Sequence, residues 1–375
     1  MALRSFQKKV AKTAFSTMVS SEPLKVFVVG GTGLIGSALR DMMTTHQAPG
    51  IECVGYCNSR YGVRRAPDGG EEEMTRWTGN VKFDDEYVER CAGRPGADVC
   101  IADCSASDSV SDHYAKWLAR GWHVATPNKK CNSGPLDRYK QCVAATSAEN
   151  GGMWFVEATI GAGLPVVSTL RTLVATGDEI RTVRGIFSGT MSFLFNTWDG
   201  KSAFSEVVAR AKDAGYTEPD PRDDLNGMDV ARKVVIAARE SGLMLSLEDV
   251  SIESLVPPHL SPEKVTAAEF MQRFGEGDAG MIEKAAKAAA AGKVLRFVGE
   301  VDVDARKAGV KLAEFPRSHP FAGLSGADNI LEIETRRYGP AGSSTPLIIR
   351  GPGAGAAVTA AGVYGDIIAI SKSKA

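Results

Sequence analysis

Short apolar runs alternate with amphipathic stretches along the first half of the chain. Residues 24–30 and 51–56 are rich in β-branched and aromatic side chains, which predicts buried strands. Residues 37–46, between them, have the composition and spacing of a helix. Further strand-like runs occupy residues 97–102 and 122–126. Strands that alternate with helices are typical of a parallel sheet covered by helices, so we expect an α/β domain here.

The second half of the chain has a different order of elements. Residues 182–186 predict a strand that passes through a glycine turn into a helix, and residues 204–213 form an amphipathic helical pattern. Residues 296–302 and 330–335 are strand-like and suit an antiparallel sheet. Small residues dominate a predicted helix at 356–370. This mixture predicts an α+β domain for substrate binding and dimerisation.

These patterns divide the chain into three parts. We expect a flexible tail or weak targeting segment at residues 1–22. We place a nucleotide-binding domain at residues 23–156 together with residues 337–375, so that the C-terminal helix returns to it. Residues 157–336 then form the second domain. A chain of 375 residues, 43% of them hydrophobic, is long enough for two domains with separate cores.

Composition narrows the range of partners and compartments. The net charge of −1 argues against nucleic acid, and no apolar run approaches the length that spans a bilayer, so we expect no membrane partner. The seven cysteines are odd in number and all lie in the first half, which favours a reduced, cytoplasmic protein. The first 21 residues are basic and contain no acid, so an organellar presequence remains the alternative.

The first predicted strand runs directly into a glycine-rich segment, Gly31-Thr32-Gly33-Leu34-Ile35-Gly36. A strand, the pattern G-x-G-x-x-G and a helix, in this order, are typical of a Rossmann-type dinucleotide site, in which the pyrophosphate meets the helix N-terminus. The alternative is an ordinary tight turn. Gly30, Gly33 and Gly36 also fit G-x-x-G-x-x-G, the pattern of short-chain dehydrogenases. Those enzymes require a lysine four residues after a tyrosine, and none of the eight tyrosines here has one.

The end of the second strand bears on the choice of cofactor. An acid near this point binds the ribose 2′-hydroxyl of NAD. The chain instead reads Cys57-Asn58-Ser59-Arg60, and its next acid is Asp68. A neutral or basic edge tolerates a 2′-phosphate, so we expect NADP, with NAD still open. Ser105 and Lys129 follow later strands and are candidate site residues, because ligands of such sheets bind at the carboxyl ends of the strands.

Residues 215–233 combine acid, proline and a helix. The acidic residues are Glu218, Asp220, Asp223, Asp224 and Asp229. Asp223 or Asp224 is placed to cap the following helix, on which Asp229 and Lys233 are neighbours four residues apart. One interpretation is a capped helix with an exposed ion pair, worth a few tenths of a kcal/mol. The other is a pocket for a small zwitterion, with Lys233 as proton donor.

Together these segments resemble homoserine dehydrogenases from about Lys25 onward. The resemblance rests on VVGGTGLIG, TPNKK, EATIGAGLP, GIFSGTMSFLFN, GYTEPDPRDDLNGMDVARK, SHPFAGLSGADN and GPGAGAAVTAAGVYGDI. It implies reversible, NAD(P)H-dependent reduction of L-aspartate 4-semialdehyde to L-homoserine, a step in threonine, methionine and isoleucine biosynthesis. With no kinase half and no C-terminal regulatory extension, the chain looks like the short, monofunctional form.

The resemblance also implies residue roles. Lys233 would be the general acid and base, oriented by Asp229, and Lys129 would assist protonation or position the substrate. Glu218 and Asp224 would bind the substrate's amino group. The implied cofactor-binding positions are Gly31, Thr32, Gly33, Leu34, Ile35, Asn58, Ser105, Lys129 and Gly355. The implied ligands of a monovalent cation such as sodium are the backbone carbonyls of Glu157, Ile160, Ala162 and Leu164. The family also implies a homodimer.

Three other interpretations compete with this one. A non-catalytic NADP-binding regulator with the same fold is disfavoured by the presence of both lysines and the acids. Another amino-acid dehydrogenase of this fold would lack the long acidic segment. A nucleophilic Cys131 would need a histidine to activate it, and the nearby His123 lies in a strand-like run.

Overall fold

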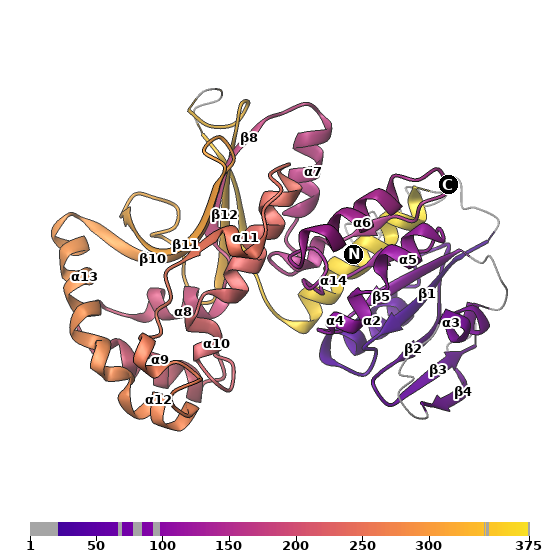
Figure 1. Cartoon of the computed structure of the whole chain (residues 1–375), viewed down its shortest axis with the longest axis horizontal. Helices are drawn as coiled ribbons and strands as arrows, with labels where there is room; N and C mark the ends of the chain where they lie inside the picture. The colour runs from indigo at the N-terminus through magenta and orange to yellow at the C-terminus, as the bar shows by residue number, and fades with distance from the viewer. Residues whose placement is uncertain are drawn as a thin grey trace, which may run out of the picture. The chain divides into compact units, whose positions relative to one another are not determined.

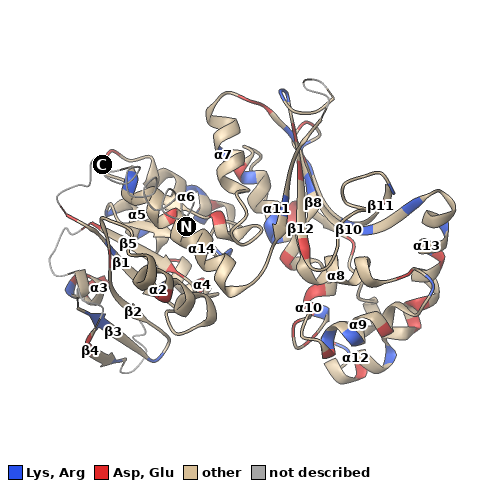
Figure 2. Cartoon of the chain, turned by 180° about the vertical axis from the view of Figure 1, so that it is seen from behind, with Lys and Arg blue, Asp and Glu red and all other residues tan. Residues whose placement is uncertain are grey.

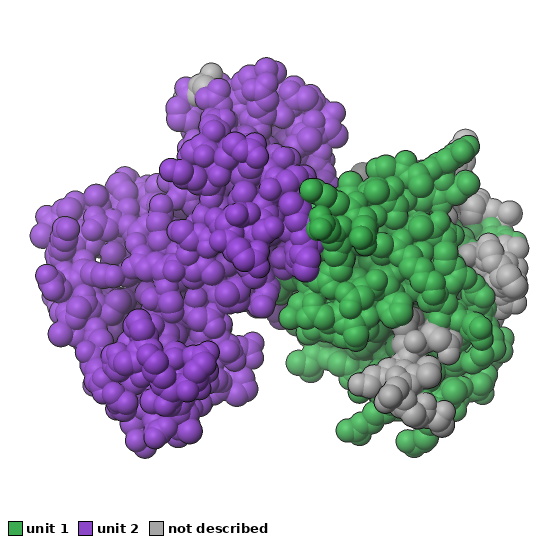
Figure 3. Space-filling view, viewed as in Figure 1, with its two compact units in different colours: residues 1–131, 137–158, 356–375 green, residues 132–136, 159–355 purple. Residues whose placement is uncertain are grey.

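The computed structural model describes residues 22–66, 70–77, 85–92, 98–340, 342 and 345–373. The chain forms two compact units (Figure 3). Unit 1 comprises residues 1–131, 137–158 and 356–375, and unit 2 comprises residues 132–136 and 159–355. Nearly all of the predicted tail at residues 1–22 lies outside the described residues.

Unit 1 is built on a seven-stranded sheet in the order β4-β3-β2-β1-β5-β6-β7 (Figure 1). Its strands are β1 (Leu24–Val29), β2 (Ile51–Cys57), β3 (Tyr61–Arg65), β4 (Glu71–Arg76), β5 (Val99–Asp103), β6 (His123–Ala125) and β7 (Trp154–Phe155). Neighbouring strands are parallel in the part of the sheet made by β2, β1, β5, β6 and β7. At one edge, β3 and β4 extend the sheet with antiparallel pairing. The predicted α/β domain with a Rossmann-type sheet is confirmed.

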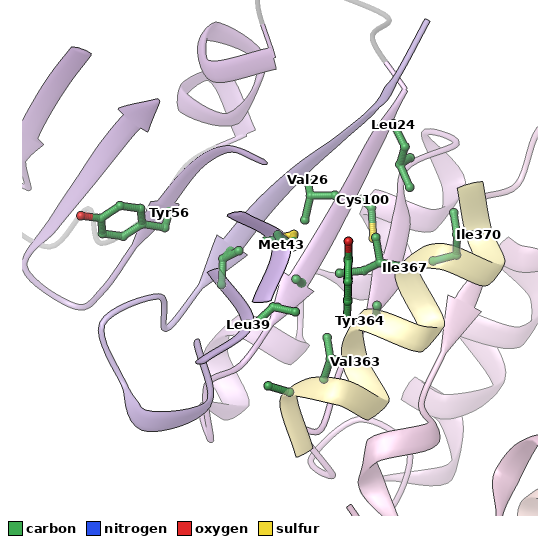
Figure 4. Packing of buried hydrophobic residues seen from close by; sticks show 14 of the residues in the cluster. Leu24, Val26, Leu39, Met43, Tyr56, Cys100, Val363, Tyr364, Ile367 and Ile370 are labelled. Carbon is green, nitrogen blue, oxygen red and sulfur yellow. The ribbon is translucent and has the colours of Figure 1, made fainter. Parts of the chain in front are cut away.

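Helices cover this sheet, and the last of them comes from the end of the chain. The helices are α2 (Leu34–His46), α3 (Asp85–Ala92), α4 (Asp108–Ser111), α5 (Tyr114–Ala119), α6 (Leu136–Thr146), the 3-10 turn η1 (Glu157–Thr159) and α14 (Ala356–Lys372). In Figure 4, Leu39 of α2 lies close to Val363 and Ile367 of α14 within one apolar cluster. Each such fully buried side chain contributes roughly 1.5–3 kcal/mol, so α14 is an integral part of unit 1.

Unit 2 contains a six-stranded sheet in the order β13-β12-β8-β10-β11-β9. Its strands are β8 (Ile180–Ile186), β9 (Val250–Ile252), β10 (Lys293–Asp302), β11 (Lys307–Pro316), β12 (Asp328–Thr335) and β13 (Leu347–Pro352). All neighbours are antiparallel except β9 and β11. The predicted α+β character of this half is therefore observed.

The helices of unit 2 include the one that carries the candidate catalytic lysine. They are α7 (Val167–Ala175), α8 (Gly189–Thr197), α9 (Phe204–Asp213), α10 (Arg222–Leu225), α11 (Met228–Glu240), α12 (Ala267–Arg273) and α13 (Asp278–Ala290), with 3-10 turns η2 (Leu247–Asp249), η3 (Pro258–Leu260) and η4 (Phe274–Gly277). Helix α11 packs on β10 and β11. A Cβ on Gly299 of β10 would lie 2.5 Å from Val234 Cγ2, so glycine permits this close approach.

The division into units differs from the predicted one near the C-terminus. We assigned residues 337–375 to the first domain, but residues 337–355 lie in unit 2. The reason is that β13 pairs with β12 and so extends the second sheet. Only the segment from Ala356 onward, which is mainly α14, returns to unit 1. No helix within the described ranges is both long and apolar enough to cross a bilayer.

Candidate active site

The glycine-rich loop of unit 1 is packed too tightly for side chains. Gly30 has a left-handed φ of +72°. A Cβ on Gly36 would lie 2.3 Å from the Gly30 carbonyl oxygen, and one on Gly31 would lie 2.6 Å from Tyr56 Cβ. Such distances are far below van der Waals contact, so each of these positions requires glycine. The loop therefore has the close turn and the close helix–strand packing that a dinucleotide site needs.

Beyond this loop, α2 begins with open backbone donors. Gly33 is its N-cap, and among the described residues no side chain caps it. Thr32, Gly33 and Leu34 are exposed, and Leu34 retains 83% of its surface. The first N–H groups of a helix lack partners within the helix and attract anions. Thr32, Gly33 and Leu34, which are among the predicted cofactor residues, thus form an exposed surface that suits a pyrophosphate.

Asn58 joins the end of β2 to this loop. Its Nδ2 donates to Thr32 Oγ1 at 3.1 Å, and its Oδ1 accepts from the amides of Arg60 and Tyr61 at 2.8 and 3.0 Å. The side chain therefore fixes the turn between β2 and β3 and holds it against the glycine loop. Arg60 lies in this turn and is exposed.

A buried polar network, which sequence reasoning missed, braces the neighbouring strand ends. The fully buried Asp103 accepts hydrogen bonds from Tyr114 Oη at 2.5 Å, from Asn128 Nδ2 at 2.9 Å and from the Ser105 amide at 2.9 Å. Burial raises the pKa of Asp103, although these hydrogen bonds oppose the rise. The signal in the sequence was an acid at the end of an otherwise apolar strand.

This network places two of the predicted site residues. Ser105 follows β5, and its amide lies 3.1 Å from where a Cβ on Gly30 would be. Lys129 follows Asn128, whose Nδ2 also donates to the Ser107 carbonyl at 3.0 Å, and it is half-buried. The loops after β5 and β6 are thereby tied together. Both residues lie at the carboxyl ends of their strands, as predicted.

Cys131 does not have the surroundings of a nucleophile. It is fully buried, and its sulfur lies 3.4 Å from that of Cys142. His123 is engaged elsewhere, with Nε2 3.1 Å from Asp98 Oδ1 and Nδ1 accepting from the Met153 amide at 2.8 Å.

The acidic segment of unit 2 has a different local structure from the one predicted. Acidic residues gather around α10 in Figure 2. Asp223 and Asp224 lie inside this short helix and do not cap α11, so the predicted capping role is wrong. Gly227, with a φ of +75°, is the N-cap of α11, and Asn226 Oδ1 accepts from the Met228 amide at 2.7 Å. Pro221 is the N-cap of α10, and this short helix ends at Leu225, two residues before the Gly227 N-cap of α11.

Asp224 instead closes the acidic loop. Its Oδ2 accepts from the Glu218 amide at 2.8 Å. Desolvation by burial raises its pKa, and the nearby charges of Asp229 and Asp223 add to the rise. Glu218 itself is exposed. The two predicted substrate residues, Glu218 and Asp224, are thus adjacent. A cationic ligand group beside the partly buried Asp224 carboxylate would relieve the repulsion among the acids.

Asp220 has a structural role. It forms an ion pair with the buried Arg222, with Nη2 2.6 Å from Oδ2. Arg222 also donates to the carbonyls of Leu260 and Val265, at 3.2 and 2.9 Å. The hydrogen bond from Arg222 lowers the pKa of Asp220. This pair anchors the acidic loop to the η3 region.

Lys233 is held by two acceptors. Its Nζ lies 2.9 Å from Asp229 Oδ2 and donates to the Phe187 carbonyl at 2.8 Å. The lysine side chain is only 12% exposed, whereas that of Asp229 is 46% exposed. An ammonium has three N–H donors. Two of them therefore have defined acceptors, which fixes the direction of the third. The pair is more buried than an ordinary surface ion pair.

The remaining predicted residues lie near the boundaries of the two units. Gly355, with a φ of +124°, directly precedes α14 and is exposed. In the segment proposed to bind a cation, Gly161 and Ala162 are both left-handed, with φ of +70° and +56°. Among the described residues, no cluster of three or more His, Cys, Asp or Glu side chains could hold a metal. A cation here would depend on backbone carbonyls.

Comparisons with known proteins cover most of the chain. A family model described as "Homoserine dehydrogenase" matches residues 165–368, and one described as "Homoserine dehydrogenase, NAD binding domain" matches residues 31–157. The homoserine dehydrogenase of Schizosaccharomyces pombe is 47% identical over 276 residues, which is 72% of each chain. A solved structure of a Candida auris protein, described as of unknown function, has a TM-score of 0.84 and 38% identity, and it covers 94% of this chain and 99% of that one.

Some relatives are much longer. The chloroplastic bifunctional aspartokinase/homoserine dehydrogenase 1 of Zea mays is 54% identical over 271 residues. The match covers 72% of this chain and 29% of the maize protein. The chain thus spans less than a third of the length of this plant relative.

Proposed function

This chain belongs to the homoserine dehydrogenase family, and from that premise we propose that it reversibly reduces L-aspartate 4-semialdehyde to L-homoserine. The reaction would serve the biosynthesis of threonine, methionine and isoleucine. The observation that carries the proposal is the placement of Lys233, whose largely buried ammonium is held by Asp229 and the Phe187 carbonyl.

The chemistry follows from where charge develops. A bound nicotinamide supplies the hydride that adds to the aldehyde carbon. Lys233 stabilises the resulting oxyanion and gives it a proton, and Asp229 orients the ammonium. Glu218 and Asp224 bind the substrate's ammonium, which the raised pKa of Asp224 supports, because a cation there would offset the repulsion among the acids. Lys129 assists protonation or positions the substrate.

NADP is the proposed cofactor. The glycine loop fits a dinucleotide, because a Cβ at Gly31 or Gly36 would fill the space that the tight turn uses. Gly31, Thr32, Gly33, Leu34, Ile35, Asn58, Ser105, Lys129 and Gly355 are the residues proposed to hold it. The choice of NADP over NAD rests on Arg60, which lies exposed in the turn that Asn58 ties to this loop.

We also propose a monovalent cation and a homodimer. The carbonyls of Glu157, Ile160, Ala162 and Leu164 are the candidate cation ligands. The left-handed φ of +56° at Ala162 supports this, since a non-glycine residue held there is strained and such strain gathers at functional sites. The exposed edge strand β13, in which Ile348 keeps 41% of its surface, supports association with a second copy.

The compartment remains a proposal as well. The Zea mays relative is chloroplastic, whereas our prediction for this chain is cytoplasmic with an organellar alternative. The basic segment on which the alternative depends lies outside the described residues. Imaging the full chain with a C-terminal fluorescent tag, beside a version without residues 1–21, would separate the two.

The experiment that tests the function measures oxidation of NADPH and of NADH by the purified protein with L-aspartate 4-semialdehyde. Lys233→Ala should lower kcat by about 10²–10⁴-fold, the range for loss of a general acid–base group. The matched control is Lys284→Ala, which removes an exposed lysine paired with Glu253 in the same unit and should leave kcat unchanged.

Three outcomes would change the proposal. Full activity in Lys233→Ala would show that the catalytic role is wrong, although family membership would stand. Wild-type protein that binds NADPH but turns over neither cofactor would favour the regulator. Equal losses in Lys233→Ala and Lys284→Ala would indicate a general effect on folding.

A further inference from the structure

The Phe187 carbonyl accepts two hydrogen bonds from side chains of two different elements. One comes from Lys233 Nζ on α11, at 2.8 Å, and the other from Asn329 Nδ2 on β12, at 3.0 Å. Phe187 directly follows β8, which pairs with β12. A carbonyl oxygen has two lone pairs, so these two donors use its full capacity. The orientation of the Phe187 carbonyl, to which Lys233 donates, therefore depends on Asn329.

Asn329 is held rigidly in this position. It is 1% exposed, and a Cβ on Gly353 would lie 2.0 Å from its Cγ and its Nδ2. Gly353 thus lets the backbone close over the amide. The orientation of the amide follows from the network, since rotation by 180° would set Oδ1 against the Phe187 carbonyl oxygen.

The other half of this amide has a notable feature. Asn329 Oδ1 is buried and has no hydrogen-bond partner among the described residues. A buried acceptor without a partner is unfavourable, so a residue with an apolar side chain would serve stability better at this position. The contact made through Nδ2 is what the asparagine contributes. It reaches only one atom, the carbonyl oxygen that also holds Lys233.

We propose that Asn329 is a positioning residue for proton transfer: it fixes the Phe187 carbonyl, which in turn aims the ammonium of Lys233. This inference rests on the proposed function. Ser188 supports it from the other end of the same peptide unit, since its side chain caps α8 by accepting from the Met191 amide at 3.2 Å. With both ends held, the carbonyl cannot follow the lysine when Lys233 loses its proton.

Asn329→Asp tests the inference. It keeps the shape of the side chain but removes the N–H donor whenever the new carboxyl is ionised. We expect kcat to fall by about 10–100-fold, the range for partners that orient a reactive group, with the KM for NADPH unchanged. A protonated carboxyl can donate again, so the ratio of variant to wild-type kcat should rise as pH falls. A purely structural role would leave this ratio constant once activity is normalised to folded protein.

Asn196→Asp is the matched control. Asn196 Nδ2 also donates to a backbone carbonyl, that of Gly326, at 3.1 Å. Its Oδ1 likewise lacks a partner within the described part of the chain. It shares no acceptor with Lys233, so Asn196→Asp should keep the wild-type kcat and pH profile.

The outcomes separate the inference from the function on which it rests. Wild-type protein that does not reduce the semialdehyde contradicts the proposed function. An active wild type with full kcat in Asn329→Asp, or with equal losses in the two asparagine variants, contradicts only the role of Asn329. If Asn329→Asp does not fold, Asn329→Ser, which is too short to reach the carbonyl, should show the same selective loss of kcat. Failure of both variants to fold would show a structural role and overturn the inference.

Discussion

The glycine loop of unit 1 and the acidic segment of unit 2 are built by different means. In unit 1, the glycine loop presents backbone N–H groups, and its shape depends on the absence of side chains at Gly31 and Gly36. In unit 2, the site depends on charged side chains, with Asp224 and Lys233 held by hydrogen bonds to backbone groups. A backbone site should fail through steric conflict, whereas a side-chain site should fail through lost chemistry while the fold persists.

Of the changes that test ligand binding, the largest effect is expected in the glycine loop. In Gly36→Ala, the added methyl would lie 2.3 Å from the Gly30 carbonyl oxygen, so either the loop or α2 must move. We expect the Kd for NADPH, measured by quenching of protein fluorescence, to rise at least about 100-fold, which corresponds to about 2.7 kcal/mol. The melting temperature should fall as well.

Gly280→Ala is the matched control for that change. Gly280 also lies in a helix, but no described atom beyond its chain neighbours and its own helix backbone lies within 4 Å of its added Cβ. Alanine in an open helical position should stabilise the protein by roughly 0.5–1 kcal/mol and leave NADPH binding unchanged. If Gly36→Ala bound NADPH as tightly as Gly280→Ala does, the glycine loop would not be the pyrophosphate site.

In the acidic segment we expect a smaller effect on ligand binding, together with a gain in stability rather than a loss. Asp224→Asn should raise the KM for the semialdehyde about 10–100-fold, since a hydrogen bond to a charged group contributes about 1.5–3 kcal/mol. The same change should raise the melting temperature at neutral pH. Burial raises the pKa of Asp224 in the folded state, so its ionised form destabilises the fold at every pH above the unfolded value of about 3.9.

The pH dependence provides the check on this second effect. The stability gain of Asp224→Asn should be full above the raised pKa of the folded protein and should vanish as pH falls below the unfolded pKa, where the carboxyl is protonated in both states. Asp223→Asn, at an exposed position in the same helix, should leave KM unchanged and should raise the melting temperature by less, because it removes only the repulsion that Asp223 adds at Asp224. A loss of stability in Asp224→Asn would mean that the carboxylate supports the fold.

The same contrast explains how much could be predicted from the sequence. The glycine spacing predicted the strand, turn and helix of the nucleotide loop, because only glycine fits there. The acid-rich segment predicted chemistry but not local structure, since α10 and the Gly227 start of α11 depend on tertiary contacts such as those of Arg222. Asp103 and Asn329 were missed because their partners are distant in sequence. Residues 337–355 were misplaced because strand pairing, rather than sequence proximity, assigns them.

The smallest effect concerns the choice between NADP and NAD. Arg60 lies exposed in the turn that Asn58 holds against the glycine loop, so its contact with a 2′-phosphate would be exposed to solvent and worth about 1 kcal/mol. Arg60→Ala should therefore raise the KM for NADPH about fivefold and leave the KM for NADH unchanged. At high salt, which screens exposed charges, the KM for NADPH of the variant and of the wild type should become equal. Arg64→Ala is the control, since Arg64 pairs with Glu72 at 3.3 Å on the adjoining strands. Equal changes for both cofactors in Arg60→Ala would show that the turn shapes the site without reading the phosphate.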